Sequence, residues 1–537
     1  MNWVLKKWLN YDTIKKIPNE VLLMMKLVCY RGHISNFKAL MAELSLDPAL
    51  AVDRNAREEA ILLAAYAAWG SEMGHHLHGK FAFALHDDET DTWFCMRDQF
   101  GTVPFYYYET ENGNFLVGTS IRDVMAQPGF EKVFNQRLLQ IYLSLTYTTG
   151  PETFFVGLTK LMPGRYLVRK GGKNEITRYF RPYFKPDESK TVEQWADEIH
   201  ETLKLVLSEV KEETEYAESF LSSGVDSSYI FALSGLQVSN SCGYDDSRLD
   251  ESGLAAETAK ALGRENRRCV VTPQQYFDAV SYVQYNMEQP LGDASAVVFA
   301  LGCRNTAKYT NVCYSGEGAD EFFGGYNMYR NAPRYGENLP TFYAGNTNIM
   351  KEDEKKKILK TYYDNLLPID FAKDIYAENA HLDPLSKMLD VDIQMWLEGD
   401  IYLNIDKMSA AAGLDVRMPL TDTRIFDIAA RIPAQFKVDP EQNKVALRTA
   451  AAKVLPEEVA WRKKLGFVVP IRVWMADERY NSDVKAKFHS DMAAQFFDLP
   501  AINAIFDEYI GGNSDLWRQV WTIYAFLVWY EEYFVKR

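Results

Sequence analysis

The pattern of apolar and polar residues in the first third of the chain is typical of short strands joined by turns. Apolar runs at residues 80–85, 92–96 and 104–108 each have the length of a strand, and the polar segment 87–91 is rich in turn-forming residues. The alanine- and leucine-rich segment 57–69 favours a helix. An α+β domain is therefore predicted for this part of the chain.

The pattern changes after the polar segment 184–190, which is the best candidate for a linker. Segments whose apolar residues recur with helical periodicity then alternate with short apolar runs typical of buried strands. This alternation predicts a parallel α/β sheet. Beyond residue 343 the chain is expected to be mostly helical, with a packed helix at the aromatic-rich stretch 517–534. We therefore predict one domain at residues 1–185 and a second at residues 190–537.

Composition narrows the classes of protein to which the chain can belong. With 537 residues, of which 47% are hydrophobic, the chain has the composition of a multidomain globular protein. The formal net charge of −15 disfavours nucleic acid as a partner, because an acidic surface repels a phosphodiester backbone. No apolar run reaches the roughly 18 residues of a membrane span, no signal peptide is recognised, and the six cysteines are scattered without metal-ligand spacing. A cytoplasmic protein that contacts neither membrane nor nucleic acid is expected.

The strongest candidate for chemistry is a serine-rich turn at residues 220–228, which precedes an apolar helical segment. A strand that leads through small residues into a helix directs backbone N–H groups at one anion, and the helix N-terminus adds about half a positive charge. An ordinary capped turn rarely combines four serines with a glycine and an aspartate. The candidate phosphate-binding residues are Leu221, Ser222, Ser223, Gly224, Asp226, Ser227 and Ser228, and Asp226 is also a candidate ligand of Mg²⁺.

A second turn, at residues 313–326, combines glycines with crowded carboxylates. Glycines permit tight backbone turns beside a ligand, and the carboxylates of Glu317, Asp320 and Glu321 are costly to crowd unless a cation or an amine is present. We interpret this turn as a magnesium-binding, amine-handling loop. Its candidate residues are Ser315, Gly316 and Glu317 for the nucleotide and Asp320 for the metal ion.

A third segment, residues 461–467, places Lys464 beside a glycine turn. A lysine in such a position can reach into a site and offset negative charge that develops on phosphate. Most paired lysines are simply solvated, so this segment carries weight only together with the other two.

These three segments, in this order and spacing, resemble the synthetase domain of the glutamine-dependent asparagine synthetases of type B. Residues 222–228 resemble the family's SGGxDSS phosphate loop, with Ser223 in place of the first of the two glycines, and residues 315–326 resemble its SGEGxDE-x-FGGY loop. Residues 406–422 resemble its DKMSMAxxLExRxPFLD segment, with Asp415 one methylene shorter than the usual glutamate. The resemblance implies a doubly wound α/β ATP-pyrophosphatase domain, similar to the adenine nucleotide alpha hydrolases, after an α+β remnant of an Ntn-hydrolase αββα sandwich.

The resemblance also implies a reaction. A carboxylate, with aspartate as the expected substrate, attacks the α-phosphate of ATP, and an amine then displaces AMP from the acyl-adenylate. In that family pattern Asp226 and Asp320 would hold Mg²⁺ on the pyrophosphate, Lys464 would stabilise the charged intermediates, and Glu317 would act as the general base towards ammonia. The β-lactam-forming relatives carry tyrosine where Glu317 stands, so Glu317 favours the asparagine-type reaction.

The amino-terminal part resembles a class II glutaminase that has lost its catalytic residues. Residues 79–84 and 97–107 look like the glutaminase segments GMFAFAxWD and RDRFGIKPLYY, but Asn2 stands where the nucleophilic cysteine is expected. Asparagine cannot form the γ-glutamyl thioester that this chemistry requires. A wrongly assigned start codon would also explain that difference. However, the family's glutamine-binding Asn-Gly-Glu turn is replaced here by Arg31-Gly32-His33, and the family's Ser-Asp helix start is replaced by Arg57-Glu58. These two replacements favour an inactive, truncated domain.

Three functions stay open from the sequence alone. The first is a ligase that joins aspartate to free ammonia, and the second is a peptide- or natural-product-tailoring ligase that uses another carboxylate and amine. The third is a non-enzymatic paralogue that binds ATP, which the intact set of Asp226, Glu317, Asp320 and Lys464 disfavours. The oligomeric state stays open too, with a homodimer as the candidate assembly.

Overall fold

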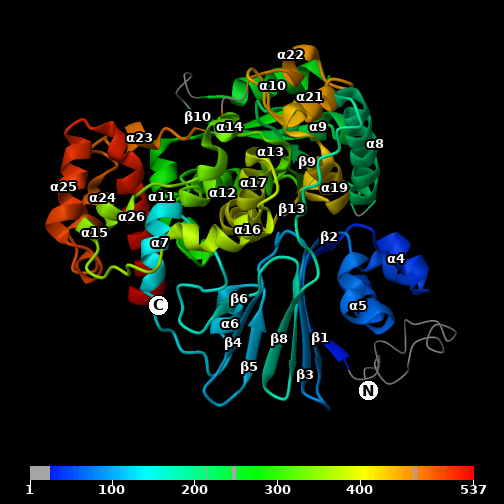
Figure 1. Cartoon of the computed structure of the whole chain (residues 1–537), viewed down its shortest axis with the longest axis horizontal. Coiled ribbons are helices and arrows are strands. Elements are labelled where there is room, and N and C mark those ends of the chain that lie inside the picture. Colours follow the sequence, from blue (N-terminus) through cyan, green and yellow to red (C-terminus); the bar gives the residue numbers. More distant parts are fainter. Residues whose placement is uncertain (1–24, 213, 245–249, 464–465, 467, 537) are drawn as a thin grey trace. The chain divides into compact units, whose positions relative to one another are not determined.

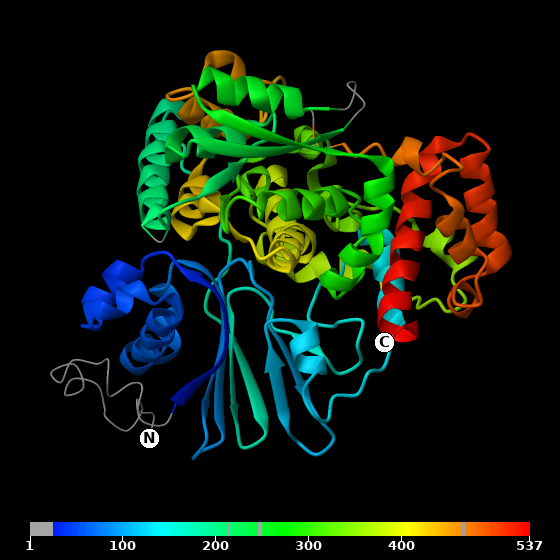
Figure 2. The same ribbon diagram turned by 180° about the vertical axis from the view of Figure 1, so that it is seen from behind.

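The computed structural model describes residues 25–212, 214–244, 250–463, 466 and 468–536. The chain forms two compact units. Unit 1 comprises Met1–Phe134 and Gly150–Pro182, and unit 2 comprises Asn135–Thr149 and Tyr183–Arg537. The segment Asn135–Thr149, which the sequence pattern placed in the first domain, therefore packs within unit 2. Its helix α7 (Arg137–Leu145) lies beside the C-terminal helix α26 (Trp517–Tyr530) in both views (Figure 1 and Figure 2).

Unit 1 is built on two antiparallel sheets. The larger has the strand order β1-β2-β3-β7-β8 and the smaller has the order β5-β4-β6. The strands of the larger sheet are β1 (Met25–Ile34), β2 (Gly79–Asp87), β3 (Thr92–Arg97), β7 (Arg165–Lys170) and β8 (Lys173–Arg178). Those of the smaller sheet are β5 (Phe115–Gly118), β4 (Tyr106–Glu109) and β6 (Thr159–Lys160).

The side chains of β2 show why unit 1 is layered. Phe81, Phe83 and Leu85 point to one face of the sheet and pack with residues of α4 (Phe37–Glu43) and α5 (Arg54–Trp69). The intervening Ala82 and Ala84 point to the other face and pack with Phe115 and Val117 of the smaller sheet. The large residues on one face pack against the helices, and the small residues on the other face pack against the second sheet. Unit 1 therefore has one helical layer and two sheets. The strands at 80–85 and 92–96 and the helix at 57–69 are confirmed, and the αββα remnant stays a prediction.

Unit 2 contains a parallel sheet that extends to both sides of its first strand. β9 (Glu218–Phe220) has β10 (Val238–Tyr244) and β11 (Glu265–Val271) on one side, and β12 (Val312–Tyr314) and β13 (Asp415–Arg417) on the other. Every neighbouring pair is parallel. The direction of winding therefore reverses between β9 and β12, and ligands of such sheets bind beyond the carboxyl ends of the strands at the reversal. The serine-rich turn and the acidic turn follow these two strands.

Helices cover both faces of the parallel sheet, as the alternating sequence pattern predicts. On one face, α9 (Val225–Ser234) and α10 (Ser252–Ala261) bury an apolar cluster that includes Phe231. On the other, α12 (Ser295–Thr306) and α18 (Leu403–Ala411) bury a cluster that includes Cys303. Further helices of unit 2 are α8 (Val192–Lys211), α11 (Pro273–Met287), α13 (Ala319–Phe323), α17 (Pro384–Val391), α19 (Thr423–Arg431), α21 (Val445–Ala451), α25 (Leu499–Ile510) and the π-helix η6 (Asp392–Tyr402).

The carboxyl-terminal part of unit 2 is mostly helical, and the predicted helix at 517–534 is confirmed by α26 and a following π-helical turn at Glu531–Val535. The helices α24 (Ser482–Phe488), α25 and α26 lie together in both views (Figure 1 and Figure 2). Among the described residues, every helix is too short or too polar to cross a membrane.

Candidate functional site

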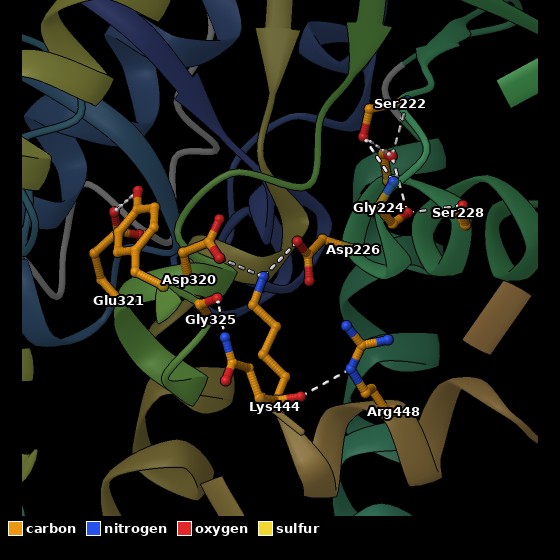
Figure 3. A network of polar contacts seen from close by, with 12 residues as sticks. Ser222, Gly224, Asp226, Ser228, Asp320, Glu321, Gly325, Lys444 and Arg448 are labelled. Carbon is orange, nitrogen blue, oxygen red and sulfur yellow. Dashed lines mark hydrogen bonds and ion pairs between the residues drawn. The ribbon is translucent and has the colours of Figure 1, made fainter. Parts of the chain in front are cut away.

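The serine-rich turn connects β9 to α9 and is held by its own hydroxyl groups. The Ser222 backbone N–H donates to Ser227 Oγ at 3.0 Å, and the Gly224 N–H donates to Ser222 Oγ at 3.1 Å. Gly224 itself is the extended residue that precedes the first turn of α9. These bonds fix the backbone of the turn at the positive end of the helix dipole, where an anion is stabilised (Figure 3).

The acidic turn follows β12 and lies directly against the serine-rich turn. A Cβ atom on Gly316 would lie 2.7 Å from the backbone nitrogen of Ser227 and 2.8 Å from the carbonyl carbon of Asp226. No side chain fits in that space, so glycine is required at 316. Gly318 has a φ of +88°, which glycine adopts without strain, and it directly precedes helix α13. The two turns that the sequence singled out are thus in contact.

Both turns line one cavity of about 410 Å³. This volume lies within the range of roughly 300–1,000 Å³ of small-molecule sites. Its wall includes ten of the predicted site residues: Leu221, Ser222, Ser223, Gly224, Asp226, Ser227, Ser315, Gly316, Glu317 and Asp320. Phe220, Phe299, Ile401 and Ile405 add an apolar wall. The combination of N–H groups, carboxylates and an apolar wall suits a nucleotide.

One predicted residue of the described part of the chain, Ser228, is not part of this wall. Ser228 is fully buried, and its hydroxyl donates to the Gly224 carbonyl oxygen at 2.8 Å, so it supports the turn and does not reach the cavity. Lys464 lies outside the described residues. Gly466, two positions further on, lines the cavity.

Lys444 is the main residue of the site that sequence reasoning missed. Its side chain is 2% exposed, and its Nζ lies 2.5 Å from Asp226 Oδ2 and 2.8 Å from Asp320 Oδ1 (Figure 3). Burial lowers the pKa of this amine, but the two carboxylates outweigh burial and raise the pKa above its ordinary value. Lys444 therefore carries its charge between the two aspartates.

Two arginines add positive charge to the same wall. Arg448 lies one helical turn after Lys444 and donates from Nε to the Asn443 carbonyl oxygen at 2.8 Å. Arg462 donates from Nη1 to the Ser223 carbonyl oxygen at 3.3 Å. The sequence does contain a signal for these basic residues. It is a lysine followed four residues later by an arginine, ahead of the segment 461–467.

The negative charges of the acidic turn raise the pKa of a neighbouring carboxyl group. Glu321 is fully buried and accepts a hydrogen bond of 2.7 Å from the Tyr326 hydroxyl. Burial, together with the negative charges of Asp320 and Glu317, raises the pKa of Glu321 to about 8. The crowding of carboxylates that the sequence predicted is therefore present. Glu317 is half-buried and lines the cavity together with Asp320.

The two predicted metal ligands fit a magnesium ion. Among the described residues, Asp226 Oδ1 is a buried carboxylate oxygen without a hydrogen-bond partner. Asp226 and Asp320 line the same cavity and lie close enough together to share the Lys444 amine. Mg²⁺ is usually bound by one or two carboxylates together with substrate phosphates and water, and this donor set matches that pattern.

Comparison with known proteins identifies the family. The family model described as "Asparagine synthase" matches residues 208–531, which is more than half of the chain. The chain belongs to the asparagine synthase family. A second model, "Glutamine amidotransferase domain", matches residues 21–180. The asparagine synthase segment contains all three motifs of the cavity, so the chain is a carbon–nitrogen ligase of that family.

Curated relatives match along almost the whole chain. Asparagine synthetase [glutamine-hydrolyzing] 1 of Bacillus subtilis is 30% identical over 95% of this chain and 86% of its own length. A putative asparagine synthetase [glutamine-hydrolyzing] of Mycobacterium bovis is 29% identical over 94% and 84%. Asparagine synthetase B [glutamine-hydrolyzing] of Escherichia coli is 25% identical over 82% and 69%. Family membership and these relatives support an ATP-dependent amide ligase activity for the chain.

Unit 1 contains a buried ion pair at Arg57 and Glu58, two residues that the sequence comparison singled out. Arg57 and Glu58, at the start of α5, are both buried, with Arg57 Nη2 3.1 Å from Glu58 Oε1. Glu58 also accepts a 3.0 Å hydrogen bond from the Tyr30 hydroxyl, next to the altered Arg31-Gly32-His33 segment on β1. Burial raises the pKa of Glu58, although Arg57 opposes this shift. Cys29, on the same strand, has a pKa raised to about 12 by burial and is not an activated thiol.

Proposed function

We propose that the chain is an ATP-dependent amide ligase that adenylates aspartate and joins it to ammonia, releasing AMP and pyrophosphate. One observation carries the proposal: Gly316 packs against Asp226 and Ser227, so that the serine-rich turn and the acidic turn face a single cavity. Family membership supports the ATP-dependent amide ligase reaction. The choice of aspartate and ammonia rests on the similarity to the named relatives and on Glu317.

In the first step, the carboxylate oxygen forms a bond to the α-phosphorus and the bond from that phosphorus to pyrophosphate breaks. Negative charge accumulates on phosphate oxygens in this step. The N–H groups at the start of α9, the Lys444 amine and the guanidinium groups of Arg448 and Arg462 supply the opposing charge. Mg²⁺ held by Asp226 and Asp320 would add charge neutralisation at the pyrophosphate.

In the second step, nitrogen attacks the acyl carbon and the bond from that carbon to AMP breaks. Glu317 lines the cavity and is half-buried, so it can accept a proton from the nitrogen as the carbon–nitrogen bond forms. Lys464 keeps its predicted role of stabilising the charged intermediate.

Unit 1 is proposed not to hydrolyse glutamine. The support is the buried Arg57–Glu58 pair, at positions that the resemblance assigns to the glutamine pocket, where Glu58 is bound to Arg57 and Tyr30. A pocket whose polar groups are already paired internally binds a polar ligand poorly.

The test is pyrophosphate release with ATP and Mg²⁺, followed by product analysis. Aspartate should stimulate release, and asparagine should form with ammonium chloride but not with glutamine. Asparagine formed from glutamine would contradict the proposed loss of glutaminase activity. No pyrophosphate release with any carboxylate would contradict the ligase itself.

The second candidate function is a tailoring ligase that joins another carboxylate and amine. Its supporting observation is a further cavity next to the nucleotide site, which is larger than ammonia requires. Pyrophosphate release that does not depend on aspartate would favour this candidate.

A further inference from the structure

A second cavity of about 540 Å³ adjoins the nucleotide cavity within unit 2. Ser295, at the start of α12, lines both cavities. The segment after the third motif also borders both, because Gly466 lines the nucleotide cavity while Val468 and Val469 line the second one. A ligand in the second cavity would therefore lie beside the nucleotide.

Three tryptophans give this cavity an aromatic wall: Trp396, Trp517 and Trp521. Trp521 is fixed because its Nε1 donates to the Gly292 carbonyl oxygen at 3.0 Å, and Trp396 Nε1 donates to the Tyr326 hydroxyl at 3.3 Å. With their N–H groups engaged, these two tryptophans offer aromatic surface to a ligand. Aromatic surface suits an apolar group and also attracts a cation.

One carboxylate, Asp293, lines the cavity, and a second, Asp400, lies on η6, the helix that also carries Trp396. Asp293 is bonded to Ser295, whose backbone N–H donates at 2.9 Å and whose hydroxyl also donates. Asp400 lies four residues after Trp396 on η6 and is fully buried, and among the described residues neither of its carboxylate oxygens has a hydrogen-bond partner. Burial raises the pKa of both carboxyl groups, and at Asp293 the hydrogen bonds from Ser295 oppose this shift and favour the charged form.

This arrangement favours a ligand that carries a positive charge. Among the described residues of the cavity wall, Asp293 forms no ion pair, and the one basic residue, Arg518, is exposed. A carboxylate group placed beside Asp293 would be repelled, whereas an ammonium group would find an acceptor. Ammonia alone would leave most of the cavity volume and all three tryptophans without a contact.

We propose that the second cavity binds the amine substrate of the ligase, a primary amine that arrives as an ammonium ion at Asp293 and packs an aromatic-sized apolar group against the tryptophans. This inference rests on the proposed ligase reaction and favours its second candidate form, in which the amine is larger than ammonia. In the reaction the ammonium nitrogen releases one proton to solvent water before attack, and Glu317 accepts a second proton as the intermediate collapses. The carbon–nitrogen bond forms, the carbon–oxygen bond to AMP breaks, and AMP leaves with the electron pair of that bond.

Binding calorimetry with matched probes tests the cavity directly. 2-Phenylethylammonium and 3-phenylpropionate have the same ring and a chain of similar length but opposite charge. With ATP and Mg²⁺ present, the full chain should bind the cation at least about tenfold more tightly than the anion, because a charge-assisted hydrogen bond is gained in one case and repulsion in the other. Equal binding, tighter binding of the anion, or no binding of either probe would overturn the proposal.

Variants then locate the binding site. Asp293→Asn keeps an acceptor for the Ser295 N–H but removes the charge, and it should weaken binding of 2-phenylethylammonium by about tenfold or more. The matched control is Asp498→Asn, which changes another aspartate that accepts a backbone N–H at a helix start, that of α25. Trp517→Ala should weaken binding of 2-phenylethylammonium about fivefold or more and leave methylammonium unchanged. Asp293→Asn and Asp498→Asn variants that bind the probe equally would overturn the assignment.

The ligase reaction is checked separately by carboxylate-dependent exchange of labelled pyrophosphate into ATP without any amine. Exchange reports adenylation alone. Exchange together with selective binding of the cation supports both proposals. Exchange without selective binding overturns only the amine site, and absence of exchange with every carboxylate overturns the ligase function, whatever the probes show.

Discussion

Lys444 is held by its backbone as well as by its charge. Its φ of 58° lies in the left-handed region, which a residue with a side chain adopts at a cost. That conformation places the residue immediately before α21, with its amine between Asp226 and Asp320. A strained residue that bridges two candidate metal ligands is expected to have a role in the reaction as well as in packing.

Replacing this lysine tests that role. Lys444→Met should lower kcat for pyrophosphate release by about 10²- to 10³-fold, the usual effect of removing one group that stabilises developing negative charge. The control is Lys453→Met, since Lys453 is a partly exposed lysine that pairs with Asp197 at the surface. If Lys444→Met lowers the melting temperature but leaves single-turnover adenylation unchanged, the lysine is only structural.

The sequence revealed the two turns but not this lysine, and the reason is separation along the chain. The turns are local: their serines, glycines and carboxylates follow one another within a few residues. Lys444 lies 218 residues from its partner Asp226, and a single lysine has no distinctive neighbours. The second cavity was hidden for the same reason, because its wall is assembled from several distant segments of unit 2.

At the scale of elements, the site depends on how closely the β9–α9 turn and the β12–α13 turn approach. The contact at Gly316 leaves no room for a methyl group. The parallel sheet was predicted correctly because helical and strand periods alternate after residue 190. The sequence could not predict which strands are neighbours, although this order brings the two turns together at the reversal between β9 and β12.

Adding one methyl group at this contact should weaken nucleotide binding. Gly316→Ala places a Cβ 2.7 Å from the Ser227 nitrogen, so one turn must shift, at a cost of about 1–3 kcal/mol. The dissociation constant for ATP should rise about tenfold or more. Gly253→Ala in α10 is the control, because a Cβ there meets no atom within 4 Å. Equal ATP affinity in the two variants would contradict the proposed contact between the turns.

At the scale of the whole molecule, the two units are interleaved in sequence. The chain leaves unit 1 after Phe134, contributes α7 to unit 2, returns at Gly150 and leaves again after Pro182. Residues 138–145, which make up nearly all of α7, are all buried. Tyr142 donates from its hydroxyl to the Thr522 carbonyl oxygen at 3.0 Å, and Gln140 donates from Nε2 to the Leu366 carbonyl oxygen at 2.6 Å. Unit 2 is therefore incomplete without residues 135–149.

A truncation measures this dependence. A chain of residues 183–537 lacks α7 and should be insoluble or unfolded at 25 °C. Each buried leucine or isoleucine side chain contributes about 1.5–3 kcal/mol, and the total stability of a domain is only about 5–15 kcal/mol. Joining residues 135–149 to Tyr183 through a flexible linker should restore a cooperative unfolding transition by circular dichroism. A well-folded 183–537 fragment without that segment would contradict this account.

The interleaving of α7 also affects the order of events during synthesis on the ribosome. Helix α7 leaves the ribosome long before its partner, because Tyr142 and Thr522 are 380 residues apart. Translation at about 5–20 residues per second leaves that apolar helix without its final neighbours for tens of seconds. The nascent chain should therefore depend on chaperones that cover apolar segments until translation of unit 2 is complete.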